Sequence, residues 1–366
     1  MNANMSSNIF YNDSSSALQI GEIKNKNSPQ SKIKFITIVI IVGIIIIIAV
    51  VLLAVLLSRK DKNHKIVKSS GENKQSIELV IDGYQDSNKG RNLQDNERKV
   101  KILGESFHEL NSSNANIYID GKKIDFNESL DIDTNEDIKL EIVLLDNIKT
   151  FKNMFKGCKR LKSVTLNKIN TTSISDVSSM FEGCTGLNEV KFEKMNISNI
   201  EYTAKMFQNC TNLNNIDINN FFTDKVKDMS QMFEGCSGLN NGTFISQLST
   251  KSSKDLTEMF FGCSKLTSLD LSGFDTSNSE TMKGMFKNMT SLIKLNLNNF
   301  NTKKVLYMNE MFENCTSIES LYLSSFNTEK VINMSRMFFN FGNLKELIYL
   351  LLIFQKVLKQ IKCLKI

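Results

Sequence analysis

The sequence predicts an α/β solenoid of about eight coils, each made of one short strand and one helix. A Met-Phe pair recurs along the second half of the chain, and successive pairs stand 26 residues apart except for one step of 27. Self-similarity at a fixed period of this length is the signature of stacked repeats. The eight pairs begin at Met154, Met180, Met206, Met232, Met259, Met285, Met311 and Met337.

The strand of each coil is expected where leucines recur after the Met-Phe pair. In the coil that begins at Met285, Leu292, Leu295 and Leu297 are the recurring apolar residues, and the last two stand two positions apart. Because alternate side chains of a strand point to opposite faces, this spacing indicates a short strand with one face on a core.

The helix is expected in the second half of each coil. Val305, Met308, Met311 and Phe312 recur at helical spacing. Thr302 precedes them, and a threonine hydroxyl can satisfy an open amide in the first turn of a helix. The sequence therefore predicts a helix of about three turns, in a leucine-rich-repeat-like βα coil.

A residue that accepts the left-handed backbone conformation closes each predicted helix. Three positions after every Met of the pair stands a glycine or an asparagine, the two residues that most readily adopt this conformation. These residues are Gly157, Gly183, Asn209, Gly235, Gly262, Asn288, Asn314 and Asn340.

Cysteine follows this position in six coils, at Cys158, Cys184, Cys210, Cys236, Cys263 and Cys315. Metal ligands, reactive thiols and core packing are the alternatives. Met289 and Phe341 hold the same position in the other two coils, and neither can replace a ligand or a nucleophile. A free cysteine packs as a small apolar residue, so we interpret the column as core.

The first part of the chain predicts a membrane anchor and a small β-rich cap. Residues 35–57 hold no charge and are long enough to span a bilayer as one helix. Residues 115–126 place Asp120-Gly121 between alternating apolar runs, which is a hairpin signal. The predicted segments are a disordered tail at 1–34, a transmembrane helix at 35–57, a basic linker at 58–75, a β-rich cap at 76–149, the solenoid at 150–343 and a degenerate coil or cap at 344–366.

Catalysis is not expected. The chain has two histidines, His64 and His108, and neither has a cysteine or carboxylate partner at useful spacing. Glycine-rich phosphate loops, nucleophile elbows and paired-acid motifs are not found in the sequence. We expect no enzyme activity, no cofactor and no metal.

The repeat resembles that of the BspA-like leucine-rich-repeat surface proteins. The resemblance covers 154–343 and is carried by units such as "MFFGCSKLTSLDLSGFDTSNSETMKGMF" and "MFENCTSIESLYLSSFNTEKVINMSRMF". It implies a surface-exposed, non-catalytic repeat domain that serves in adhesion or binds protein or matrix ligands. We expect a single-pass protein of the cell membrane with its repeats outside the cell; a membrane-tethered interaction scaffold facing the cytosol is the alternative.

The candidate ligand-facing residues lie between the leucines of each strand, where side chains point away from the core. They form a polar ribbon of mixed charge, without the basic stripe of a nucleic-acid binder. Simple solvation of these side chains is the competing interpretation. The candidates are Thr165, Lys191, Asp217, Asp270, Asn296 and Tyr322, with Thr243 added if the irregular coil keeps its register.

Overall fold

The computed structural model describes residues 74–83, 99–132, 134–195, 197–219 and 221–342, all within one compact unit that spans Val67–Ile366. The expected tail at 1–34, the expected anchor at 35–57 and the expected end segment at 344–366 lie outside these residues, as does most of the linker at 58–75. Among the described residues, no helix has the length and apolar character needed to cross a bilayer.

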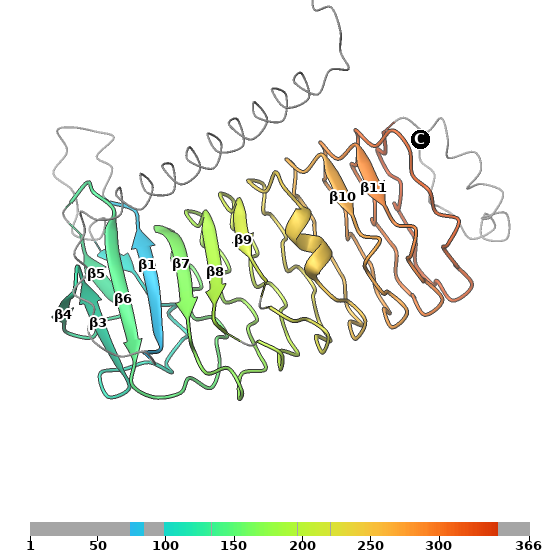
Figure 1. The fold of residues 1–366 in the computed structure, drawn as a ribbon. Helices are drawn as coiled ribbons and strands as arrows, with labels where there is room; N and C mark the ends of the chain where they lie inside the picture. The colour runs from blue at the N-terminus through green and yellow to red at the C-terminus, as the bar shows by residue number, and fades with distance from the viewer. Residues whose placement is uncertain (1–73, 84–98, 133, 196, 220, 343–366) are drawn as a thin grey trace, which may run out of the picture. The chain divides into compact units, whose positions relative to one another are not determined.

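The repeats form a solenoid whose strands lie side by side. Strands β7 (Leu161–Asn167), β8 (Glu189–Glu193) and β9 (Asn215–Asp217) pair in parallel, and β10 (Ser268–Asp270) pairs in parallel with β11 (Lys294–Asn296) (Figure 1). Each strand alternates buried and outward residues, as the leucine spacing predicts.

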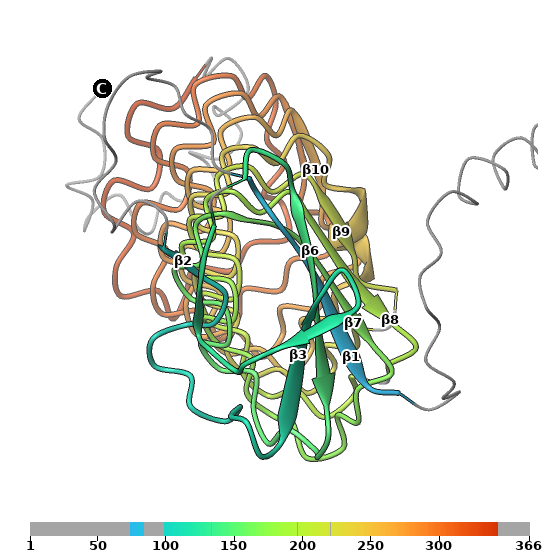
Figure 2. The ribbon, with the colours of Figure 1, turned by 90° about the vertical axis from the view of Figure 1, so that its left-hand side faces the viewer.

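The β-rich module joins the same sheet. Strand β1 (Ser76–Ile81) pairs antiparallel with β7 of the first coil on one side and with β6 (Ile138–Leu144) on the other. Strands β3 (Ala115–Ile119) and β4 (Lys122–Ile124) form the expected hairpin beyond β6. The sheet therefore runs in the order β4-β3-β6-β1-β7-β8-β9 (Figures 1 and 2), while β2 (Lys99–Lys101) and β5 (Ser129–Asp131) form a separate pair.

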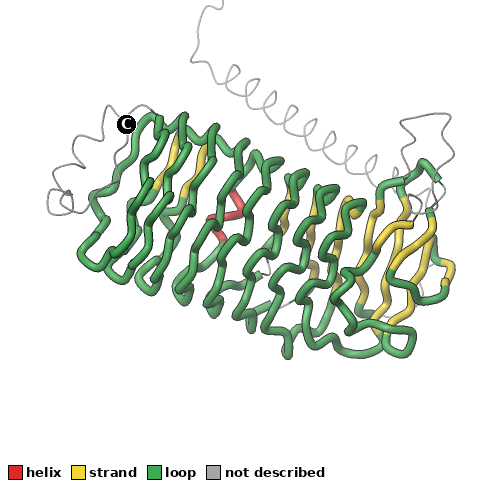
Figure 3. The backbone as a smooth tube through the Cα atoms, turned by 180° about the vertical axis from the view of Figure 1, so that it is seen from behind, coloured by secondary structure: helices red, strands yellow, loops and turns green. Residues whose placement is uncertain are grey.

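The prediction of an α/β fold with a helix in every coil is wrong. Within the described residues there is no α-helix; the one named helical element is a short 3-10 helix, η3 (Thr243–Gln247) (Figure 3). The segments expected to be helical are runs of tight turns, so the solenoid is built of strands and turns rather than of βα units.

Backbone hydrogen bonding explains why turns replace the helix. In the coil around Phe312, the amides of Met311, Glu313 and Cys315 donate to the carbonyls three residues earlier in the same coil. The amides between them donate instead to the next coil; that of Phe312, for example, reaches Met337 O at 2.9 Å. Since a helix would use all of these amides for bonds to the fourth preceding carbonyl, the bonds between coils exclude it.

A second ladder of residues runs along the turn side of the solenoid. Parallel bridges link one residue of each coil to the next, on the segment that precedes the Met-Phe pair by four residues. The column consists of Asp176, Tyr202, Asp228, Asp255, Thr281, Tyr307 and Asn333.

The threonines expected as helix caps hold neighbouring coils together instead. The hydroxyl of Thr302 donates to Asn327 O at 2.8 Å and accepts the amide of Asn327 at 2.7 Å. Thr276 does the same with Asn301 of the next coil. Since the hydroxyl satisfies both backbone groups of one residue across the gap between coils, it stabilises the stacking.

The prediction that these glycines and asparagines adopt the left-handed conformation is confirmed, although they close turns and not helices. All eight glycines and asparagines after the Met-Phe pairs have positive φ, from 50° at Asn340 to 75° at Gly157. A second left-handed residue, which the sequence did not reveal, precedes each Met; examples are Glu310 at 62° and Arg336 at 58°.

The core is a continuous stack along the solenoid axis. The phenylalanines of successive Met-Phe pairs stack from Phe155 to Phe338, with ring centroids 5.3–6.1 Å apart and nearly parallel planes. The methionines beside them are buried as well. The Met-Phe pairs are therefore part of the core.

Candidate binding surface

The outward face of the sheet brings the first three candidate residues together. Thr165 lies opposite Lys191, and Lys191 lies opposite Asp217, in the parallel register of β7, β8 and β9. All three side chains are partly exposed. They form one row across three coils.

The remaining candidates form a second row, separate from the first. Asp270 lies opposite Asn296, whose side-chain amide donates to the Asp270 carboxylate at 2.9 Å. Tyr322 lies in the next coil and is 64% exposed, which makes it one of the most exposed large hydrophobic residues in the described structure.

The 3-10 helix η3 divides the two rows. It stands where the strand of the irregular coil is expected, between β9 and β10 (Figure 1). Thr243 is its first residue and does not extend the ladder, so the idea that this coil keeps its register is wrong. Phe244 and Ile245 of the helix are buried, and the extra residue of the 27-residue step lies in this coil.

The first row continues into the β-rich module, which sequence reasoning missed. Glu78 on β1 lies opposite Thr165, Glu141 on β6 lies opposite Glu78, and Tyr118 on β3 lies opposite Glu141. The polar face therefore spans the seven-stranded sheet rather than the repeats alone. The alternation of apolar and polar residues within β1 and β6 is the sequence signal that could have placed these residues on the same face.

Some candidate residues have a structural role. The carboxylate of Asp217 accepts the amide of Asn219 at 3.1 Å, and that of Asp270 accepts the amide of Ser272 at 3.0 Å. The side-chain oxygen of Asn296 does the same two residues on. These are Asx turns, which bend the chain at the end of each strand. The backbone hydrogen bond from Ser272 is the main reason why the pKa of Asp270 is lowered.

Charge is mixed where the module meets the first coils. Partial burial, followed by the nearby charges of Glu141 and Glu193, raises the pKa of Glu78. Lys74 forms an ion pair with Glu141 at 2.8 Å, and Lys191 forms one with Glu189 at 3.0 Å. Like charges on directly opposed strand residues are destabilising, so the Glu78–Glu141 pair opposes folding.

Comparison with known proteins places the repeats in a family. A family model described as "Mycoplasma protein of unknown function, DUF285" matches residues 126–243, 205–320 and 239–349, which together exceed half of the chain. The chain belongs to the DUF285 family. No curated protein and no solved structure matches the chain. The description of the family assigns no activity.

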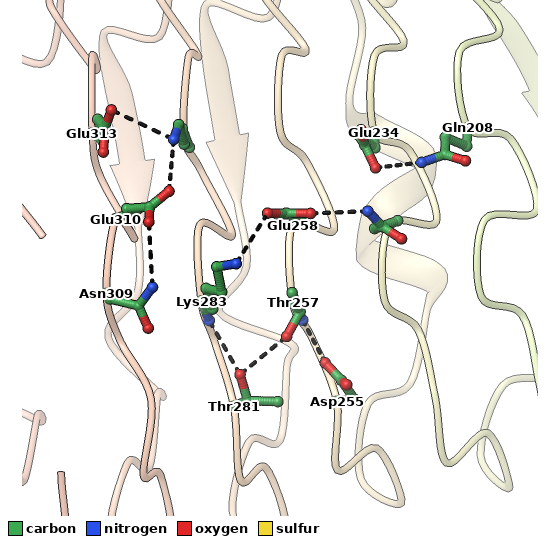
Figure 4. A network of polar contacts seen from close by, with 12 residues as sticks. Gln208, Glu234, Asp255, Thr257, Glu258, Thr281, Lys283, Asn309, Glu310 and Glu313 are labelled. Carbon is green, nitrogen blue, oxygen red and sulfur yellow. Dashed lines mark hydrogen bonds and ion pairs between the residues drawn. The ribbon is translucent and has the colours of Figure 1, made fainter. Parts of the chain in front are cut away.

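The turn side of the DUF285 coils carries a different set of polar contacts (Figure 4). Gln208 donates to Glu234 at 2.5 Å, and Lys287 contacts Glu310 at 2.6 Å and Glu313 at 3.4 Å. Each of these contacts joins one coil to the next. These polar groups therefore hold neighbouring coils together.

Glu313 is the most enclosed carboxylate of this network. Its side chain is 6% exposed and accepts two hydrogen bonds from the guanidinium of Arg336, at 2.7 and 2.9 Å. These bonds are the main cause of its lowered pKa. The arrangement is a clamp between the last two described coils rather than a reactive site.

The cysteine column of the DUF285 repeat is part of the core. All six thiols are fully buried and free of disulfides. That of Cys184 donates to Phe155 O at 2.9 Å, and that of Cys210 donates to Phe181 O at 3.0 Å. Burial raises the pKa of Cys263 to about 12, so its reactive thiolate is suppressed at neutral pH.

Metal-ligating groups do not gather in the described part of the chain. No three His, Cys, Asp or Glu side chains there are placed to hold an ion together. The seven-stranded sheet of this unit carries a row of outward residues that runs from Tyr118 through Glu141, Glu78, Thr165 and Lys191 to Asp217.

Proposed function

We propose that the solenoid is a non-catalytic binding module, displayed at the cell surface, whose seven-stranded sheet face takes up protein or matrix ligands. The observation that carries the proposal is the continuity of this face from β4 to β9. Repeat proteins commonly bind partners along the extended surface that their stacked strands create. Adhesion as the purpose of binding comes from the resemblance of the repeat to BspA-like surface proteins.

Free side chains on this face support the proposal. Ser163 and Thr165 point outward from β7, and neither side chain forms a hydrogen bond among the described residues. They differ in this from turn-side residues such as Gln208, Lys287 and Glu313, whose side chains join coil to coil. A ligand on the sheet face would therefore meet side chains that can be used without weakening the stack.

The chemistry of the face favours many weak contacts. Its residues are polar and of mixed charge, with Tyr118 as the aromatic member on β3. Tight protein interfaces concentrate aromatic residues and arginine at their centres, which this face does not. We propose that affinity comes from several strands, or several molecules on one surface, acting together.

The proposed location rests on the sequence. The membrane location derives from the apolar run at 35–57 and from the basic clusters on both sides of it, which are nearly balanced and so do not fix the orientation. The alternative, a scaffold that faces the cytosol, predicts a different result when intact cells are treated with a protease. Loss of the repeats from intact cells supports surface display, and protection until the cells are permeabilised supports the scaffold.

The binding face is tested with two charge-matched variants. Ser163→Lys with Thr165→Lys alters the sheet face, where the new lysines lie opposite Glu189 and Glu78. The control is Ser173→Lys with Asn212→Lys, at two exposed turn positions off the sheet. Retention of each protein on immobilised fibronectin, collagen and laminin is then compared with that of the parent chain.

The proposal predicts that one or more of these surfaces retains the parent and the control but loses the sheet-face variant. Equal retention of all three proteins would show that the sheet face is not the site. If none of the surfaces retains the parent, matrix adhesion is wrong as the function of this module.

A further inference from the structure

The irregular coil carries the only Asn-Gly pair of the sequence, Asn241-Gly242. The pair stands directly before η3, in the gap between β9 and β10 (Figure 1). Asn241 is exposed, and Gly242 has φ −101° and ψ 12°, a conformation open to other residues. A left-handed backbone therefore does not account for the glycine at this position.

The backbone of this segment lacks hydrogen bonds that hold the regular coils. In the coil before it, the amides of Asn214 and Asn215 both donate to Asn188 O, at 3.1 and 3.0 Å. Their counterparts in the irregular coil are Asn240 and Asn241, whose amides donate no hydrogen bond to another described residue. A segment without such bonds opens locally at little cost in free energy.

The amide nitrogen of Gly242 can react with the side chain that precedes it. This amide donates no hydrogen bond to another described residue, and glycine has no Cβ to hinder its approach to Cγ of Asn241. The Oδ1 atom of Asn241 accepts the amide of Thr243 at 3.0 Å. A donor at this oxygen stabilises the negative charge that the oxygen acquires when Cγ is attacked.

We propose that Asn241 is a site of spontaneous deamidation in the folded protein. The nitrogen of Gly242 loses its proton to water or hydroxide and forms a bond to Cγ of Asn241. The bond from Cγ to Nδ2 then breaks, and Nδ2 takes up a proton from solvent and leaves as ammonia. The succinimide ring that results is opened by water to aspartate or to isoaspartate. The reaction consumes water alone and needs no oxidant, reductant or enzyme.

The modification changes the sheet side in the coil where its two rows separate. Asn241 holds the position that Asn215 and Ser268 hold in the neighbouring coils. A carboxylate here adds a negative charge in the coil between that of Asp217 and that of Asp270. Aspartate keeps the acceptor oxygen for the amide two residues on, whereas isoaspartate lengthens the backbone by a methylene carbon. The proposal does not depend on what the sheet face binds.

Peptide mapping of the full chain after incubation in warm, mildly alkaline buffer tests the proposal. The readouts are the mass change from amide to acid at 241 and methylation by an isoaspartate methyltransferase, which marks isoaspartate. Gly242→Ala should slow the conversion by at least about tenfold, because a Cβ hinders the approach of the nitrogen. This Cβ would lie 3.4 Å from the nearest side-chain atoms, so alanine fits the fold.

The matched control is a second Asn-Gly pair whose glycine amide is held. Lys156→Asn creates it at 156–157, where the amide of Gly157 donates to Glu182 O at 2.7 Å. Each rate in the folded protein is divided by the rate of the same pair in denaturant. We expect this ratio to be at least about tenfold higher for Asn241, since a hydrogen-bonded amide opens rarely. Equal ratios, an Asn241 that stays unchanged in the folded chain, or equal rates in the parent and Gly242→Ala would overturn the proposal.

Discussion

The thiol of Cys184 donates a hydrogen bond to the carbonyl oxygen of Phe155 in the preceding coil, across 2.9 Å. The contact recurs at Cys210, Cys236, Cys263 and Cys315, so the column both fills the core and satisfies a carbonyl.

Cys210→Ala should therefore destabilise the solenoid by about 1–2 kcal/mol, because it opens a small cavity and removes the thiol donor. Chemical denaturation measures the change in the free energy of unfolding. Bound zinc in the purified parent, lost in the variant, would contradict the packing role.

The same burial should make the six thiols slow to react in the folded protein. Burial raises the pKa of Cys158 and Cys315 to about 12, so the thiolate is scarce at pH 7. Alkylation by iodoacetamide, followed by mass spectrometry, should label these cysteines in denaturant and leave them unlabelled in buffer. Labelling at equal rates in both conditions would contradict the buried column.

Gly183 tests the left-handed turn after the Met-Phe pair. Its φ is 72°, and a Cβ there would meet no atom closer than 3.8 Å, so backbone conformation rather than space limits the residue. Gly183→Ala should destabilise the protein by about 1 kcal/mol and Gly183→Asn by less, since asparagine accepts this conformation. Thermal unfolding compares them, and equal losses would argue against the turn.

Thr302 distinguishes a bridge between coils from a helix cap. Its hydroxyl both donates to and accepts from the backbone of Asn327. Thr302→Ser should be tolerated, whereas Thr302→Val should cost about 1–3 kcal/mol, because two partly buried backbone groups of Asn327 lose their partner. Thr302→Asp separates the two roles. It would preserve a helix cap, but here it buries a carboxylate that cannot donate, and it should destabilise at least as much as Val.

Glu78 should make stability depend on pH. Its pKa is raised by burial and by Glu141 and Glu193, so the folded protein holds this proton to higher pH than the unfolded chain does. Stability contributed by the protonated group is present at low pH and is lost as the pH rises through the raised pKa. Glu78→Gln should therefore raise the melting temperature at pH 7 and leave it nearly unchanged at pH 4. An equal shift at both pH values would contradict this origin.

The sequence predicted the repeat, the strands β7 to β11, the buried cysteine column and the left-handed turn residues. It did not predict the local structure around Val305, Met308 and Met311. Turns that bond to the third preceding residue bury a side chain every three positions, and this pattern also fits one face of a helix. The left-handed position before each Met is held by different residue types, such as Glu310, Arg336 and Gly284. The residue type at this position therefore does not indicate its backbone conformation.

The candidate row was predicted in part for a similar reason. Strand periodicity placed Thr165, Lys191 and Asp217 on one face, and their register follows from the repeat. Pairing of β1 with β7 is a long-range contact that no local pattern encodes, so the extension through Glu78 was missed.

The absence of helices from the described coils is tested most directly by an engineered disulfide. Tyr202 and Asp228 are neighbours in the second ladder, joined by a parallel β-bridge. Neighbouring parallel strands lie about 4.8 Å apart. That spacing suits a disulfide, whereas packed helices would hold the same positions about 8–10 Å apart. Tyr202→Cys with Asp228→Cys should form the bond under mild oxidation, and Tyr202→Cys with Asp255→Cys, which skips one coil, should not. If the first pair remains reduced in the folded protein, the result would contradict the ladder and would favour a helix in each coil.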